Sequence, residues 1–97
     1  MRAIIRTDGT RVDLERAHSL DELRRIIGAE ILDTVVLRAL GTPRLVMLLD
    51  DQGHDRVRPI NGVATKLYHL HCREGTMHPI VGDVAIVPDA DFTQEAS

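Results

Sequence analysis

Three short runs of aliphatic residues, at positions 31–37, 45–49 and 84–87, most constrain how this chain can fold. Each run is apolar at both odd and even positions, whereas a strand with one solvated face alternates apolar with polar residues. Aromatic residues make up only 2% of the 97 positions, so the aliphatic side chains must build the core. We therefore expect all three runs to be buried strands that supply the core, with the run 31–37 in the centre of a sheet.

The N-terminal part contains a predicted hairpin and a predicted helix. RAIIRT and RVDL are β-compatible runs, and the Asp-Gly pair between them is typical of a tight hairpin turn. Ser19 and Glu22 have the spacing of a capping box, in which each residue satisfies the backbone N–H of the other. Apolar residues recur at helical intervals over 20–27, and Gly28 stands where a helix-ending glycine belongs. We expect two strands followed by a helix.

A second helix is predicted after Pro59. Pro59 or Asn61 suits its start, and Gly75 suits its end. The alternative is a strand over 68–72, which would place alternate residues of that segment on opposite faces. The pattern leaves both interpretations open. The positions that recur at helical spacing and would face the core are Ile60, Val63, Ala64, Leu67 and His71.

Together these elements predict one α+β domain over residues 1–90, with a mainly antiparallel sheet of four to six strands and two helices packed on it. Residues 91–97 are expected to form a flexible acidic tail. A chain of 97 residues has room for a single modest core and therefore for one domain.

The distribution of charge argues against nucleic-acid binding. The formal net charge is −3, with eight basic and seven acidic residues over 1–48 and four basic and eight acidic residues over 49–97. Clustered Lys and Arg, which would release counterions from phosphates, are absent from the sequence. No apolar run approaches transmembrane length, and a single cysteine allows no intrachain disulfide. We expect a cytoplasmic protein that binds neither nucleic acid nor membrane.

The stretch HLHCREGTMH places three histidines and the only cysteine within ten residues. On a helix His69 and His71 point about 200° apart and cannot share a metal ion, whereas on a strand they share a face that His78 could join. One thiolate without a CxxC pair offers no structural zinc site. A lone Cys72 is more commonly a buried small side chain than a nucleophile. We expect no metal and no cofactor.

Five polar or titratable residues form the candidate site for a ligand or a partner. They could converge between the end of the second helix and the start of the last strand, and binding residues favour loops on a rigid scaffold. The sequence contains no nucleophile elbow, phosphate-binding glycine loop or zinc-protease motif, so we assign no catalytic residues. The candidate residues are Asn61, His69, His71, His78 and Asp83.

The segments VRPINGVATKLY and HPIVGDVAIVPDADF resemble a family of small bacterial, phage and plasmid proteins called domain of unknown function 3846. The resemblance extends over most of the chain and implies an uncharacterised accessory protein, often carried on mobile elements. It implies no catalytic residues, and HLHCREGTMH departs from the family's pattern. The positions that carry the resemblance are Pro59, Asn61, Ala64, Leu67, Ile80, Val81 and Gly82.

These observations predict a non-enzymatic module that binds another protein or a copy of itself. A small sheet has edge strands, and an edge strand can pair with an extended segment of a partner. The alternative is a small metal- or histidine-dependent enzyme, or a ligand-binding protein, that uses the segment from His69 to His78.

Overall fold

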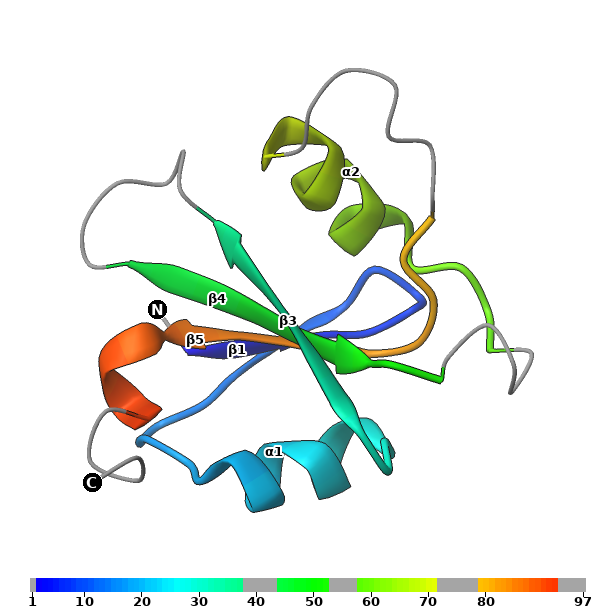
Figure 1. The fold of residues 1–97 in the computed structure, drawn as a ribbon. Helices are drawn as coiled ribbons and strands as arrows, with labels where there is room; N and C mark the ends of the chain where they lie inside the picture. The colour runs from blue at the N-terminus through cyan, green and yellow to red at the C-terminus, as the bar shows by residue number, and fades with distance from the viewer. Residues whose placement is uncertain (1, 38–43, 53–57, 72–78, 93–97) are drawn as a thin grey trace.

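The computed structural model describes residues 2–37, 44–52, 58–71 and 79–92 of the chain, without the side chains of residues 71 and 92. These residues form one antiparallel sheet of five strands and two α-helices (Figure 1), which confirms the predicted α+β class. In chain order the elements are β1 (Ala3–Ile5), β2 (Arg11–Asp13), α1 (Leu20–Ile27), β3 (Leu32–Leu37), β4 (Leu45–Asp50), α2 (Gly62–His71), β5 (Val84–Pro88) and a 3₁₀ helix (Asp89–Phe92).

The strand order in the sheet is β2-β1-β5-β4-β3, and every neighbouring pair is antiparallel. The last strand of the chain, β5, is therefore the central one. The expectation that the run 31–37 is central is wrong, because β3 lies at one edge. Apolar residues at both odd and even positions require other elements to pack on both faces of a strand, but they do not require a neighbouring strand along both of its edges.

The core uses the three apolar runs unequally. Every residue of β4 except Leu49 is buried, and so is every residue of β5 except Pro88. In β3 only Leu37 is fully buried, and Ile31, just before the strand, is 51% exposed. The run 31–37 thus supplies less of the core than predicted, whereas 45–49 and 84–87 confirm the prediction.

The two helices cover opposite faces of the sheet (Figure 1). Met47 and Ile86 pack in a cluster with Ala64 of α2, while Leu48 packs in a second cluster with Leu23 of α1. Because side chains alternate between faces along a strand, β4 and β5 need an apolar residue at every position. The three layers explain the apolar runs of the sequence.

Helix α1 begins and ends as its sequence predicts. The backbone N–H of Glu22 donates to the Ser19 hydroxyl at 3.1 Å, and the backbone N–H of Ser19 donates to the Glu22 carboxylate at 3.1 Å. This capping box confirms the prediction. Gly28 ends the helix at a φ of 74°, a left-handed conformation that favours glycine.

Helix α2 confirms the helical interpretation of residues 62–71 over the alternative strand. Its first turn is held by Asn61, whose side-chain oxygen accepts the backbone N–H of Ala64 at 3.1 Å. Ile60 and Val63, predicted to face the core, are instead 61% and 40% exposed. Polar capping rather than apolar contact fixes the start of this helix, which then packs through Ala64 and Leu67. Cys72 and Gly75 lie outside the described residues.

The segment after β5 is joined to the start of the chain. Arg2 donates from Nε and Nη2 to the two carboxylate oxygens of Asp91, each at 2.8 Å. The Asp91 side chain is 6% exposed and lies in the 3₁₀ helix. For residues 93–97, which lie outside the described part of the chain, the flexible tail stays a prediction.

Candidate functional site

Asn61, the first of the predicted site residues, is fully buried and connects three parts of the fold. Its side-chain amide donates to the backbone oxygens of Ile5, at 2.9 Å, and Gly82, at 3.0 Å. With the cap of α2, these bonds join β1, the turn before β5 and the helix. A buried amide with these partners holds the scaffold together and presents no group to solvent.

Asp83 follows Gly82, whose backbone oxygen accepts the Asn61 amide and whose φ of 79° turns the chain before β5. The Asp83 carboxylate accepts the backbone N–H of Thr7 and the guanidinium of Arg6, both at 3.0 Å. The structure therefore brings Asn61 and Asp83 to one turn, and both side chains fasten that turn to the end of β1.

The histidines do not join this turn within the described part of the chain. His69 is exposed on α2, eight residues beyond Asn61 and therefore about 12 Å further along the helix axis. His71 is the last residue of the same helix, so its backbone lies further still from the turn that contains Asp83. His78 lies outside the described residues, and its role stays a prediction.

No group of three or more His, Cys, Asp or Glu side chains in the described ranges could hold a metal ion. That finding does not cover the whole histidine-rich segment, because Cys72 and His78 fall outside those ranges. The expected absence of a metal and a cofactor stays a prediction.

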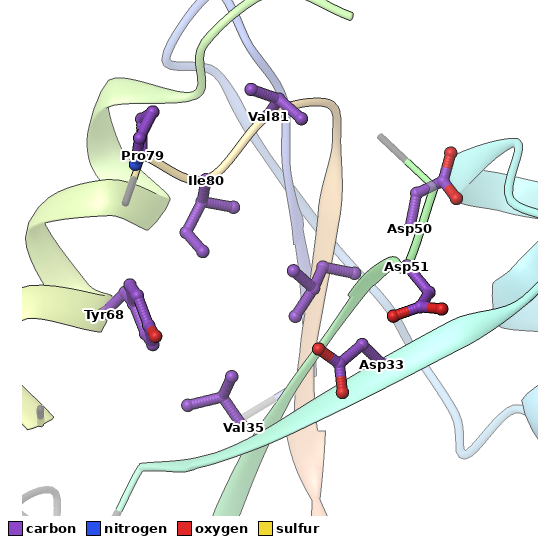
Figure 2. Close-up of a pocket in the computed structure, with 9 residues that line it drawn as sticks. Asp33, Val35, Asp50, Asp51, Tyr68, Pro79, Ile80 and Val81 are labelled. Carbon is purple, nitrogen blue, oxygen red and sulfur yellow. The ribbon is translucent and has the colours of Figure 1, made fainter. Parts of the chain in front are cut away.

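A pocket that the sequence did not predict lies between α2 and the outer strands of the sheet (Figure 2). Its volume is about 190 Å³, whereas sites for small molecules typically measure about 300–1,000 Å³. It therefore fits one side chain better than a whole substrate. The pocket is lined by Asp33, Val35, Leu49, Asp50, Asp51, Tyr68, Pro79, Ile80 and Val81.

Two of the three aspartates give the pocket its charge. Asp33 pairs across the ladder with Leu49, and Asp51 follows Leu49 by two residues, so both carboxylates lie on the α2 face at diagonal positions. Figure 2 shows both opposite the Tyr68 ring, which points into the pocket from α2. Both aspartates are exposed, and neither forms an ion pair with another described residue.

Asp50 belongs to the other face of the sheet and is 4% exposed. Its Oδ2 lies 2.9 Å from Nε of Arg58, and its Oδ1 accepts the backbone N–H of Gln52 at 2.9 Å. Arg58 also donates to the backbone oxygen of Gly28, and its aliphatic chain passes Gly82 so closely that a Cβ there would approach it to 3.0 Å. Figure 2 shows the Asp50 carboxylate directed away from the pocket. This pair serves the fold and leaves Asp33 and Asp51 as the carboxylates of the pocket.

The outer edge of β3 adjoins this pocket, and one hydrogen bond fixes which backbone groups it exposes. The N–H of Asp51 donates to the backbone oxygen of Ile31 at 3.0 Å, just beyond the paired residues Leu32 and Asp50. In an antiparallel ladder, pairs that exchange hydrogen bonds alternate with pairs that do not. Since Ile31 is bonded to β4, every second residue from there on also directs its backbone groups to β4.

The residues between them, Leu32, Thr34 and Val36, direct their backbone groups outward. The bonding of Thr34 agrees with this alternation, because its N–H donates to the Asp33 side chain at 2.9 Å instead of to β4. The sheet order ends at β3, so no other described strand pairs with this edge. The sequence could not reveal the edge or the pocket, because both depend on the register between β3 and β4.

The comparisons with known proteins add no relative: no family model, no curated protein and no solved structure matches this chain. The resemblance to domain of unknown function 3846 therefore stays a prediction. Among the described residues, no helix is long and apolar enough to span a membrane.

Proposed function

We propose that this protein binds an extended segment of another protein, which adds as a further strand to the outer edge of β3. The observation that supports this proposal is the run of outward backbone groups at Leu32, Thr34 and Val36. An extended segment satisfies such groups with its own N–H and C=O groups, which gives affinity without a particular sequence.

The form of β3 also favours strand addition. The strand is six residues long, and its α1 face carries the half-buried apolar side chains of Leu32 and Val36. A long apolar edge is the kind that proteins usually protect with charge, bulges or short length. A bound segment would cover this edge and extend both apolar faces of the sheet.

A binding module fits the chain better than an enzyme does. The pocket is small and mostly apolar, and its two exposed carboxylates lie opposite a tyrosine rather than a nucleophile or a histidine. The single cysteine and the resemblance to a mobile-element family support a cytoplasmic accessory protein. Pairing of β3 with a second copy is the alternative within the same class.

The test is selection of binders from a library of random ten-residue peptides, followed by NMR titration of the ¹⁵N-labelled protein. We expect selected peptides to shift the amides of residues 32–37. Thr34→Pro should weaken binding at least tenfold, because the proline ring obstructs an approaching strand and removes an outward N–H. Asp13→Pro, which alters the opposite edge of the sheet, is the matched control and should bind as the unaltered protein does.

Other outcomes would contradict the proposal. Shifts confined to α2, together with loss of binding in Leu70→Glu, would place the partner on the outer face of that helix, where Leu70 is 73% exposed. Failure to select any peptide, with sedimentation showing a dimer that Thr34→Pro dissociates, would replace the foreign segment with a second copy.

A further inference from the structure

We infer that the segment bound at β3 carries a lysine or arginine whose side chain enters the pocket between α2 and the sheet and ends at Asp33 and Asp51. This inference rests on the proposed function and names the chemistry of the partner. It concerns the pocket, whereas strand addition concerns the backbone edge, so the two can be tested apart.

Strand geometry places the side chain on the correct face. In a segment paired with β3, the residues on the α2 face lie beside Asp33 and Val35, which share that face. From the added strand, Asp51 lies two interstrand spacings away, a distance of about 10 Å. Lysine, arginine and tyrosine have polar-ended side chains long enough to extend across β3 towards it, and of these lysine and arginine carry a positive charge.

The lining of the pocket matches such a side chain along its length. Val35, Leu49 and Ile80 offer apolar contacts to an aliphatic stem, which lysine and arginine bury readily while the charged end stays near water. The Tyr68 ring forms the facing wall, where a cation is attracted to an aromatic face.

Charge complementarity selects a cation for the far end. Asp33 and Asp51 lie on one face at diagonal positions, where like charges repel, and no described cation pairs with either. In the unbound protein Asp33 uses Oδ1 to accept the N–H of Thr34 and has its second oxygen unused; an added strand that takes over the N–H of Thr34 leaves both oxygens to a guanidinium or ammonium group. A second copy of this chain would bring its own Asp33 to the same edge, and its net charge of −3 adds further repulsion. The occupant is therefore a basic segment of a different protein.

The pocket is tested with a probe that lacks a backbone, n-butylguanidinium, and with neutral butyramide as the comparison. We expect millimolar n-butylguanidinium to shift the methyl signals of Val35, Leu49 and Ile80, and butyramide to leave them in place. The double variant Asp33→Asn, Asp51→Asn should lose this response. Asp13→Asn, Asp89→Asn changes the net charge equally at two exposed residues outside the pocket and should keep it.

The selected peptides supply the second arm. Replacing their basic residue with norleucine, which keeps the stem and removes the charge, should weaken binding about tenfold, as should the pocket variant Asp33→Asn, Asp51→Asn. The reversed variant Asp33→Lys, Asp51→Lys should prefer peptides with glutamate at that position.

Each failure has its own signature. Peptides that shift residues 32–37 equally well with lysine or norleucine, with no methyl response to n-butylguanidinium, would overturn the inference and leave strand addition standing. A response to n-butylguanidinium without peptide binding at β3 would overturn strand addition and support the preference of the pocket for a cation. Equal responses to n-butylguanidinium and butyramide would overturn the role of charge.

Discussion

The two edges of the sheet differ in how well they are protected. β2 has three residues, all exposed, whereas β3 has six and is half-buried. The backbone N–H of Leu14 donates to the oxygen of Arg2, and the backbone N–H of Arg6 donates to the oxygen of Thr10. Because bonded and unbonded positions alternate along the ladder, Val12 directs its backbone groups to β1. The outward positions of β2 are therefore Arg11 and Asp13.

Those two outward residues also pair with each other, at 2.7 Å between Nε of Arg11 and a carboxylate oxygen of Asp13. A short edge with paired charges is a poor template for another strand. The edge of β3 has an apolar residue at two of its three outward positions, and it adjoins the pocket. The difference is the reason that the proposed function places the partner at β3 and not at β2.

The largest expected effect is the difference in stability lost when one apolar side chain is truncated in each edge strand. Leu37→Ala in β3 removes a side chain that is fully buried, so it should lower the free energy of unfolding by about 3 kcal/mol. Val12→Ala in β2 alters a side chain that is 41% exposed and should cost less than about 0.5 kcal/mol. Urea denaturation measures both values, and equal losses would show that the two edges are packed alike.

A smaller effect tests the phase of the outward groups in β3. Val35→Pro removes an N–H that the inferred phase directs to β4, and an unsatisfied ladder partner should lower the free energy of unfolding by about 2 kcal/mol. Thr34→Pro removes an outward N–H and should cost less than about 1 kcal/mol. The reverse order in urea denaturation would mean that the phase is shifted by one residue and that the proposed binding edge is wrong.

The smallest effect is a pH dependence at the turn between β1 and β2 and at the start of α1. Hydrogen bonds from the Arg16 side chain and the Ser19 backbone lower the pKa of Glu22 from 4.5 to about 2. The pKa of Asp8, bonded by Thr10, and that of Asp21, bonded by Arg24, are also lowered. A lowered pKa in the folded state stabilises the fold above the ordinary pKa, and this stabilisation is lost as the pH falls from about 4.5 towards 2.

Amide exchange between pH 5 and pH 2 measures this dependence region by region. We expect protection at the start of α1 to fall before protection in β3, and Glu22→Gln to remove most of the change at α1. Loss of protection in β3 first would contradict the view that charged hydrogen bonds hold the start of α1 and apolar packing holds β3.

Local patterns in the sequence determined the elements on which both edges are built. The hairpin turn, the capping box of Ser19 and Glu22 and the C-terminal Gly28 depend on residues within a few positions of one another, so the sequence alone predicted β1, β2 and α1. The apolar runs likewise predicted β4 and β5. Asn61 was correctly suggested as a start for α2, although its amide hydrogen bonds to Ile5 and Gly82 could not be foreseen.

Tertiary structure alone decided which strand is central and where the pocket lies. A strand that is covered on both faces is apolar at every position, whether it lies at the centre of the sheet or at its edge. The periodicity of the sequence therefore could not distinguish β3 from β5. Asp33 and Asp51 are 18 positions apart in the sequence, and they share a face because Leu32 pairs with Asp50. A register shifted by one residue would have directed one of them to the face covered by α1. The choice of register is made by long-range strand pairing, which no local pattern encodes.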